Sequence, residues 1–516
     1  MTEHNLGNIR LISFGIPVGV LLFTVLMSFW DFDGLLALTT AVNSWILFHF
    51  SSLFNWSTFA FVLTCVWAFL SPLGRVTIGG KSAEKILNPW QWFSITLCTT
   101  IAIGILFWAT AEPIFHLNVP PEATGLKAGS DEAATFAVAS LFMHWSFTPY
   151  AIYTVPALTF ALAYYNMGKP FSLSGPLSFV LGKVVTGKVA DYIDAVALFA
   201  LIAGIAATLG AGMMSISGGI ARVSGLETSP LLQAFVVIAI VGAFVISSVT
   251  GLHKGIRILS NINAKFFFLL CIFVFVAGPT SYTVSLLWDG MLEYVRTFVP
   301  RSLGIGSSYD EAWSQSWTVF YWANWLAWAP ITALFLGRIS RGYTVRQFIV
   351  VNFIAPSLFA IVWMSIFGGA AIHIDQARGV LRQSLETLGP ESIAYEVLAN
   401  YPLSSVLMVV FVFLSFVSYV TAADSNTDAM ANVCLRDGDL SNSDSQEKQR
   451  GLIMWLKIML AVLMGAAAWI LTAYTGIDGV RMMSNLGGLP ALFIVIALNV
   501  VLLLFGTRLL KRISDR

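Results

Sequence analysis

The sequence is poor in charged residues. Asp, Glu, Lys and Arg make up 11% of its 516 residues, the formal net charge is +1 and the mean hydropathy is +0.80. This near-neutral balance gives no indication of a nucleic-acid partner. Hydrophobic residues make up 57% of the chain, which indicates a polytopic membrane protein rather than a soluble domain with a buried core.

Cysteine and nucleotide-binding motifs are also scarce. The four cysteines lie in or at the ends of apolar stretches without metal-ligand spacing, so we expect free, buried thiols. The chain has no Walker loop, dinucleotide fingerprint or kinase-type pattern, which argues against an ATP-driven pump. The first apolar run is too long for the core of a signal peptide and is expected to remain as a membrane helix.

Apolar runs that can cross roughly 30 Å of hydrocarbon recur along the whole chain. They predict an all-α protein with twelve transmembrane helices, at 11–30, 51–71, 91–115, 134–165, 191–217, 231–250, 258–287, 315–337, 346–371, 405–434, 452–473 and 485–506.

The Lys and Arg residues test this count, because cytoplasmic loops hold the excess of positive charge. With a cytoplasmic N-terminus, nineteen of the 28 fall on the inner side, seven on the outer side and two, Lys265 and Lys457, within helices. This split supports the helix count and predicts that both termini are cytoplasmic.

Two outer segments are not predicted to span the membrane. Residues 288–302 mix apolar and charged positions and are typical of a helix in the membrane interface. Residues 375–404 carry four acidic residues and are interpreted as a solvated excursion. The predicted units are then 1–90, with the first two helices, 91–287, with helices 3–7, 288–314 outside, 315–506, with helices 8–12, and a basic tail at 507–516.

The segment Trp313–Pro330 holds five tryptophans and a tyrosine. On a helix, Tyr321, Trp325 and Trp328 share one stripe, which predicts the wall of a binding site for a cationic small molecule. Trp322 and Asn324 flank this stripe. Trp313 and Trp317 are interpreted as membrane-interface residues. The alternative for Trp325 and Trp328 is lipid-facing or packing tryptophan.

The fourth predicted helix contains a second aromatic group, between His144 and Tyr153. Pro149 can kink this helix, so that Trp145, Tyr150 and Tyr153 face the tryptophans of helix 8. A quaternary ammonium has no N–H to donate, so an aromatic box is the site that holds it. His144 is interpreted as a packing or hydrogen-bonding residue, because no partner ligand lies at a coordinating spacing.

Interrupted helices offer unpaired backbone groups to substrates and ions. Helix 3 has Gly104 near its middle and Glu112-Pro113 towards its outer end, and helix 8 contains Pro330. The two helices are separated by five positions in the order of helices along the chain. This is the spacing expected if helices 3–7 and 8–12 are inverted repeats of one another.

Ionisable residues inside the membrane are energetically costly, so each is first interpreted as a candidate functional residue. Asp424 of helix 10, with Thr421, Ser425 and Thr427 around it, could coordinate Na⁺, relay a proton or pair with another helix. Lys265 is either a snorkelling residue or a fixed cation that stands in for a bound ion.

Several motifs closely resemble the betaine/choline/carnitine transporter (BCCT) family. They are WTVFYWANWLAWAP with FLGRISRGYTVRQF (317–348), ATAEP (109–113), HWSFTPYAIY (144–153), GLHKGIRILSNIN (251–263) and TAADS (421–425). The resemblance covers nearly the whole chain. It implies two N-terminal helices followed by two inverted five-helix repeats, as in LeuT-like symporters, usually in a homotrimer. It also implies transport of glycine betaine, choline or carnitine by alternating access.

The resemblance assigns substrate-path positions to Trp145, Tyr153, Trp325 and Trp328, and one hydroxyl of the family's sodium site to Thr421. Several positions depart from the family pattern. Tyr150 and Asn324 stand where Trp is frequent, Ala422 replaces a second sodium-site hydroxyl, and Ala102 and Gly104 belong to a stretch, 100–104, in which the family's Gly-x-Gly-x-Gly is incomplete. The departures at Tyr150 and Asn324 predict a substrate with an extra polar group or one other than glycine betaine. Ala422 is expected to weaken a Na⁺ site without abolishing it, and the bulk at Ala102 to alter how the backbone approaches a carboxylate.

We therefore expect an inner-membrane, multi-pass secondary transporter of a small ammonium or sulfonium compound, with no cofactor and with Na⁺ or H⁺ as the candidate coupling ion. The short termini predict nutrient-type rather than osmotically gated uptake. One alternative is an ion-independent carnitine/butyrobetaine-type exchanger. A remote one is a membrane enzyme that uses Glu112, His144 and Asp424, which the sequence places at unmatched depths without a nucleophile. The absence of repeated carbonyl or charge rings disfavours a channel.

Overall fold

A computed structural model describes residues 9–514 apart from 102–103, 171, 183–184, 186, 250–252, 307–308 and 436–442. These residues are almost entirely helical, and their β pairing is limited to two isolated bridges, Ile9 with Leu435 and Thr77 with Thr344. The all-α polytopic class predicted from the sequence is confirmed.

The helices of the first half run from the N-terminus to residue 277. They are α2 (Leu11–Trp30), α3 (Phe32–Leu70), α4 (Pro89–Ile101), α5 (Gly104–Asn118), α6 (Asp131–Trp145), α7 (Phe147–Met167), α8 (Ser174–Leu181), α9 (Lys188–Ser224), α10 (Pro230–Val249) and α11 (His253–Ala277).

The second half begins with α12 (Thr280–Leu303). There follow α13 (Glu311–Ser314), η4 (Gln315–Val319), α14 (Phe320–Arg338), α15 (Val345–Ile349), η5 (Val350–Ile354), α16 (Ala355–Arg378), α17 (Val380–Leu388), η6 (Pro390–Ser392), α18 (Ile393–Ala399), α19 (Ser404–Val433), α20 (Ser443–Thr475) and α21 (Ile477–Ser514).

Eight described helices are individually long and apolar enough to cross a membrane, and a ninth span results if α11 and α12 are counted as one. The remaining expected spans are helical too. The third consists of α4 and α5, on either side of residues 102–103, which lie outside the described part. The fourth is divided into α6 and α7 at Ser146, and the sixth is α10, whose described apolar stretch is Pro230–Ile246.

The two largest differences from the predicted boundaries are in the second and seventh helices. The second helix begins at Phe32 rather than 51, and the Asp31 side chain caps it by accepting a hydrogen bond from the Gly34 N–H at 2.8 Å. The seventh ends at Ala277 rather than 287, because the chain turns at Gly278-Pro279 and α12 leaves at 109° to the preceding helix. The interfacial helix expected at 288–302 is therefore the second part of a longer element.

The segment 375–404 is also not the solvated excursion that we predicted. Helices α17, η6 and α18 fold back on the bundle, and Leu381, Ile393, Tyr395 and Leu398 have 1% or less of their surface exposed. Burial also raises the pKa of the Glu391 carboxyl in η6. The apolar positions between the acidic residues carry this packing, and the acidic residues had obscured them in the sequence.

The fourth span breaks at Ser146, whose φ of −115° and ψ of −119° lie outside the helical region. Pro149 has no N–H to donate to the carbonyl of Trp145 four residues earlier, so a continuous helix would lack one backbone hydrogen bond at this point. The predicted kink therefore lies immediately after Trp145, at the place where α6 meets α7.

The eighth and ninth spans each contain a π-helical turn, η4 and η5 respectively. The fourth span, five positions before the ninth, is the one that breaks at Ser146. An interruption thus recurs in the second helix of each predicted repeat. π turns are rare and frequently mark functional sites.

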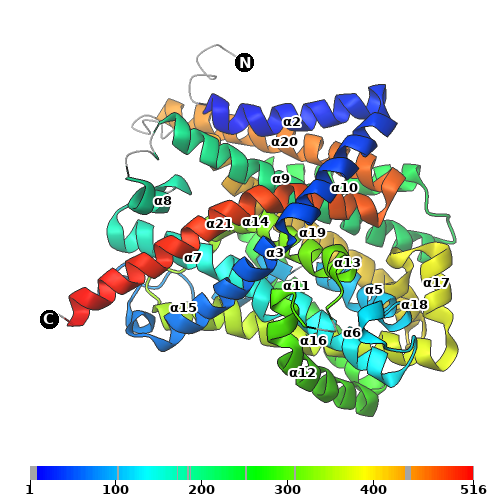
Figure 1. Cartoon of the computed structure of the whole chain (residues 1–516). Coiled ribbons are helices and arrows are strands. Elements are labelled where there is room, and N and C mark those ends of the chain that lie inside the picture. Colours follow the sequence, from blue (N-terminus) through cyan, green and yellow to red (C-terminus); the bar gives the residue numbers. More distant parts are fainter. Residues whose placement is uncertain are drawn as a thin grey trace.

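Helix α14 occupies a central position and packs against α7, α9 and α21, while α5 packs against α6 and α16. Figure 1 shows α17 and α18 (yellow) at one end of the bundle and α8, α15 and the C-terminus at the opposite end. These are the ends that the charge distribution predicts to be outer and inner respectively. Cys65, Cys271 and Cys434 are free and buried, as expected, and the Cys98 side chain lies outside the described part.

Candidate functional site

The two predicted aromatic groups meet around Trp325 of α14. The Trp325 ring centroid lies 5.5 Å from that of Trp145, 5.8 Å from Tyr150 and 5.3 Å from Tyr153. Interplanar angles of 56–73° mean that these rings form a cup rather than a stack. We call these four residues the aromatic box. The Trp325 indole N–H donates to the His144 carbonyl at 3.2 Å, which fixes the orientation of the ring.

Gly104 of α5 lies directly against the Trp145 ring. A Cβ added at this glycine would come within 2.5 Å of the indole, so a larger residue would displace the ring. Gly104 therefore supports the aromatic box by packing. Ala102, the other position expected on this helix, lies outside the described residues.

The remaining predicted substrate residues point in different directions. Tyr321 adjoins the box, with its ring 5.3 Å from that of Trp145. Trp322 lies against His144 instead, at 6.1 Å, and Asn324 accepts a hydrogen bond from the Ser484 hydroxyl of α21 at 3.1 Å. Trp328 packs against α9 at Gly204.

The predicted ion-coupling residues are only partly described. The Thr421 hydroxyl is buried and donates to the backbone of its own helix, at 2.9 Å from the Val417 carbonyl and 3.0 Å from that of Ser418. The side chains of Asp424 and Ser425 lie outside the described part of the structure. Lys265 is exposed, as a snorkelling lysine would be. The role of each in ion coupling stays a prediction.

A buried ionic cluster lies beside the aromatic box, on the predicted outer side. The Glu112 carboxylate has no exposed surface and accepts hydrogen bonds at both oxygens. Oε1 faces His144 Nδ1 at 2.6 Å and His116 Nε2 at 3.3 Å. Oε2 accepts from the Tyr321 hydroxyl at 2.5 Å and from the Trp145 indole N–H at 2.9 Å.

This cluster corrects two of our interpretations. Glu112 and His144 are not at unmatched depths but in direct contact, because the helices that carry them cross at this point. His144 also has potential co-ligands, since Glu112, His116 and His144 offer ligand atoms that lie within 4.8 Å of one another. The spacing along one helix could not show this, because Glu112 and His116 belong to another.

Trp313 and Trp317 are not the interfacial belt residues that we predicted. Trp317 is 7% exposed and its ring lies 4.5 Å from His116, and Trp313 stacks on His144 at 5.8 Å. The Arg301 guanidinium lies over Trp313 at 5.4 Å and that of Arg481 over Trp317 at 4.7 Å. These rings therefore separate the two arginines from the Glu112 cluster.

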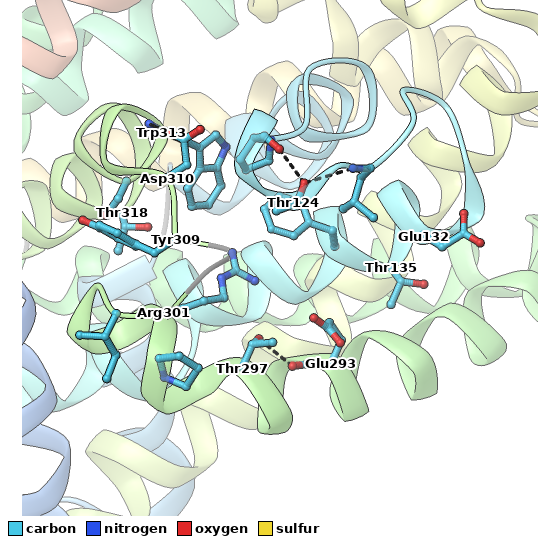
Figure 2. A pocket seen from close by; sticks show the side chains of 17 residues that line it. Thr124, Glu132, Thr135, Glu293, Thr297, Arg301, Tyr309, Asp310, Trp313 and Thr318 are labelled. Carbon is cyan, nitrogen blue, oxygen red and sulfur yellow. Dashed lines mark hydrogen bonds between the residues drawn. The ribbon is translucent and has the colours of Figure 1, made fainter.

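A cavity of about 550 Å³ adjoins the cluster at the predicted outer end. Figure 2 shows Arg301, Tyr309 and Trp313 projecting into it, with Glu132 and Glu293 at its edge. Thr318 also lines the cavity and bonds to His144 Nε2 at 3.0 Å. The exposure of Glu132 and Ile305 shows that the cavity opens to the surface.

Residues 12–508 match the betaine/carnitine/choline family transporter description. The chain belongs to this BCCT family. It is 33% identical over 450 residues to glycine betaine transporter 1 of Vibrio parahaemolyticus, covering 86% of this chain and 83% of the relative.

Two further relatives give the same family. The chain is 31% identical to the glycine betaine transporter OpuD of Bacillus subtilis, over 78% of each protein. It is 29% identical to the ectoine/hydroxyectoine transporter of Virgibacillus pantothenticus, over 90% of each. These relatives are named as transporters, in agreement with the expectation that the chain is not an enzyme.

A solved structure of a Na⁺-coupled sialic acid symporter, in a substrate-bound outward-open state, is also similar to this BCCT protein. It covers 90% of this chain and 98% of its own, with 11% identity and a TM-score of 0.47, a likeness too distant to carry an argument.

Sequence reasoning on this BCCT protein missed four residues of the cluster and its surroundings: His116, Arg301, Thr318 and Arg481. One signal was available. Glu112 and His116 are four residues apart on an apolar helix and so share one face. A carboxylate and a histidine on one buried face require partners from another helix.

Proposed function

We propose that this BCCT protein is an ion-coupled secondary transporter of small quaternary-ammonium or sulfonium compounds, which it takes up across the plasma membrane by alternating access. Glycine betaine, choline and carnitine are the substrates within this class that we consider first. The division into two five-helix repeats and assembly as a homotrimer belong to the same proposal.

The aromatic box is the observation that carries this proposal. Four aromatic rings from α6, α7 and α14 converge, and each of these side chains has 3% or less of its surface exposed. A methylated ammonium group is attracted by ring faces at about 0.5–2 kcal/mol per ring and needs no hydrogen-bond acceptor. Two relatives are named as glycine betaine transporters, which supports the same substrate class.

The test is a titration of the purified protein by intrinsic tryptophan fluorescence. Glycine betaine, choline, carnitine, dimethylsulfoniopropionate and ectoine are compared, each with and without Na⁺. We expect saturable binding of at least one methylated compound. Replacing Trp325→Leu keeps apolar bulk but removes the central π face, and should weaken binding up to roughly 30-fold, equivalent to about 2 kcal/mol.

The matched control is Trp288→Phe, because Trp288 is 63% exposed on α12 and lies outside the box. It should bind with unchanged affinity. If the wild-type protein binds none of the methylated compounds, or if Trp325→Leu binds them as tightly as the control, the proposed substrate class is wrong. Binding of ectoine alone would shift attention to sites that offer hydrogen-bond acceptors.

A further inference from the structure

The Glu112 carboxylate differs from an ordinary buried salt bridge in the type of its partners. No Lys or Arg contacts it within the described structure, and its four hydrogen-bond partners are two histidines, a tyrosine and a tryptophan. Histidine is the side chain whose charge changes most readily near neutral pH. The cluster can therefore gain or lose a proton without breaking a permanent ion pair.

The geometry favours a proton over a metal ion as the occupant. His144 Nδ1 and Glu112 Oε1 are 2.6 Å apart, which is a short hydrogen-bond distance with a hydrogen between the two atoms. Zinc ligands lie about 2.0–2.2 Å from the ion in tetrahedral geometry, so two of them are separated by more than 3 Å. The Trp145 indole, which is only a donor, also holds the second carboxylate oxygen.

His144 accommodates either protonation state without movement of heavy atoms. Its Nδ1–H donates to Glu112, while Nε2 faces the Thr318 hydroxyl. Neutral His144 accepts a hydrogen bond from Thr318 at Nε2, and protonated His144 donates one to the same oxygen. A hydroxyl that can reverse its role is suited to pass a proton, by giving its own hydrogen to Nε2 and taking one from water.

Thr318 lines the cavity that opens at the predicted outer surface (Figure 2), and it is bonded to His144 Nε2 at 3.0 Å. On the other side of the cluster, Trp145 and Tyr321 connect Glu112 to the aromatic box. The π turn η4 contains Thr318, and Tyr321 follows in the next turn. A continuous hydrogen-bonded chain thus runs from the cavity through Thr318, His144 and Glu112 to two rings at the substrate site.

We propose that Glu112 and His144 together form the proton-binding site that couples substrate uptake to proton entry. A proton from water in the cavity reaches His144 Nε2 through Thr318, and the pair changes from a net charge of −1 to 0. This change alters the strength with which Glu112 accepts from Trp145 and Tyr321. After the transporter opens inward, the proton returns to water on the other side. The inference rests on the proposed function.

Other charged groups around the pair set its electrostatic surroundings. His116 of α5 bonds to the same carboxylate oxygen. Arg301 of α12 and Arg481 of α21 lie behind Trp313 and Trp317, and both interact electrostatically with Glu112. Asp375 of α16 is bonded to Asn118 and to the Arg382 backbone N–H, at the end of α5. The positive charges of the two arginines make the addition of a second proton to the cluster less favourable.

The experiment uses the purified full-length protein in liposomes, free of Na⁺, with the membrane potential clamped and a pH-sensitive dye inside. Radiolabelled glycine betaine and choline are the probes. With one proton per substrate, an inward gradient of two pH units can drive roughly 100-fold accumulation. We expect wild type to accumulate a probe and to acidify the lumen when the probe is added.

Glu112→Gln and His144→Gln should lose gradient-driven accumulation and the acidification. Thr318→Val removes the hydroxyl but keeps the shape, and should slow proton entry more than it weakens binding. The matched control is His373→Gln, because His373 lies on α16 against Tyr282, away from the cluster. It should behave as wild type. Fluorescence binding of the same probes reports whether each variant still folds and binds.

Three outcomes would overturn the inference. Wild-type uptake that ignores the pH gradient, and that appears only when an inward Na⁺ gradient is added to the same liposomes, would exclude proton coupling while leaving the proposed function intact. Acidification that persists in folded Glu112→Gln would place the proton elsewhere. Stoichiometric zinc in the purified protein, lost in His144→Gln, would make the cluster a metal site. Absence of any probe binding to wild type would instead contradict the proposed function.

Discussion

Two carboxylate clusters, one partly buried and one fully buried, lie at opposite ends of the bundle and differ in their partners. At the predicted inner end, the Arg10 guanidinium bonds Asp191 at 2.5 Å and Asp194 at 2.6 Å, which fastens the start of α2 to α9. At the predicted outer end, no arginine among the described residues forms a hydrogen bond with Glu112, and the nearby Arg301 and Arg481 lie on aromatic faces.

This difference separates a structural contact from a group that can change state. A guanidinium is always protonated, so Arg10 keeps its positive charge at every physiological pH and the inner cluster contains a permanent cation. The imidazoles around Glu112 can take up or release a proton at little structural cost. We infer that the inner cluster stabilises the fold and that the outer cluster responds to its environment.

The largest effect should follow from breaking the inner cluster. Arg10→Ala leaves Asp194, whose side chain is 1% exposed, without a compensating charge. We expect the free energy of unfolding to fall by about 3 kcal/mol, measured by thermal unfolding in detergent.

Adding Asp194→Asn to that variant should restore part of the stability, because the uncompensated charge is removed. Glycine betaine affinity and gradient-driven uptake of the folded fraction should not change. A loss of proton-driven accumulation in Arg10→Ala, as large as in Glu112→Gln, would show that the two clusters do not have separate roles.

A smaller effect is expected for Tyr321→Phe, which keeps the ring but removes a hydrogen bond to a charged oxygen. Such bonds contribute about 1.5–3 kcal/mol, against about 0.5–1.5 kcal/mol for neutral ones. The comparison variant is Tyr395→Phe, whose hydroxyl donates to the Ser215 carbonyl at 2.8 Å. Thermal unfolding should show the larger loss in Tyr321→Phe. Equal losses would mean that Glu112 is not charged in the resting protein.

The smallest effect should come from an exposed pair. Arg382 and Glu386 are four residues apart on α17, with side chains 56% and 62% exposed. Arg382→Ala should change the free energy of unfolding by less than about 0.5 kcal/mol, and 1 M salt should remove the difference. A change in the free energy of unfolding as large as that of Arg10→Ala would show that burial does not decide how much each cluster contributes to stability.

The helices and the aromatic box were accessible from the sequence, because both follow from local patterns. Apolar length located the spans, and the helical spacing placed Tyr321 and Trp325 on one face. Pro149 located the break beside Trp145. Asn324 could not be assigned in this way, because its contact with Ser484 depends on the packing of α21 against α14.

The Glu112 cluster was not accessible, since its members come from three helices and only their packing brings them together. The error at Trp313 and Trp317 has a related cause. Depth was counted along a straight helix from the expected interface, whereas α12 carries Arg301 over this region and η4 changes the helical register. Hydropathy indicates which segments contact lipid. It does not show which tryptophans are covered by other parts of the chain.

The π turn η4 has a consequence for how this chain tolerates insertions and deletions. A π turn holds one residue more than the α-helical turn that it replaces. Deleting one residue within Gln315–Val319 would restore a regular helix and rotate everything before it by about 100°. Trp313 would then turn away from His144, while Tyr321, Trp325 and the rest of α14 would stay in place. The extra residue in this turn is thus what allows one helix to present its aromatic residues to two different neighbours.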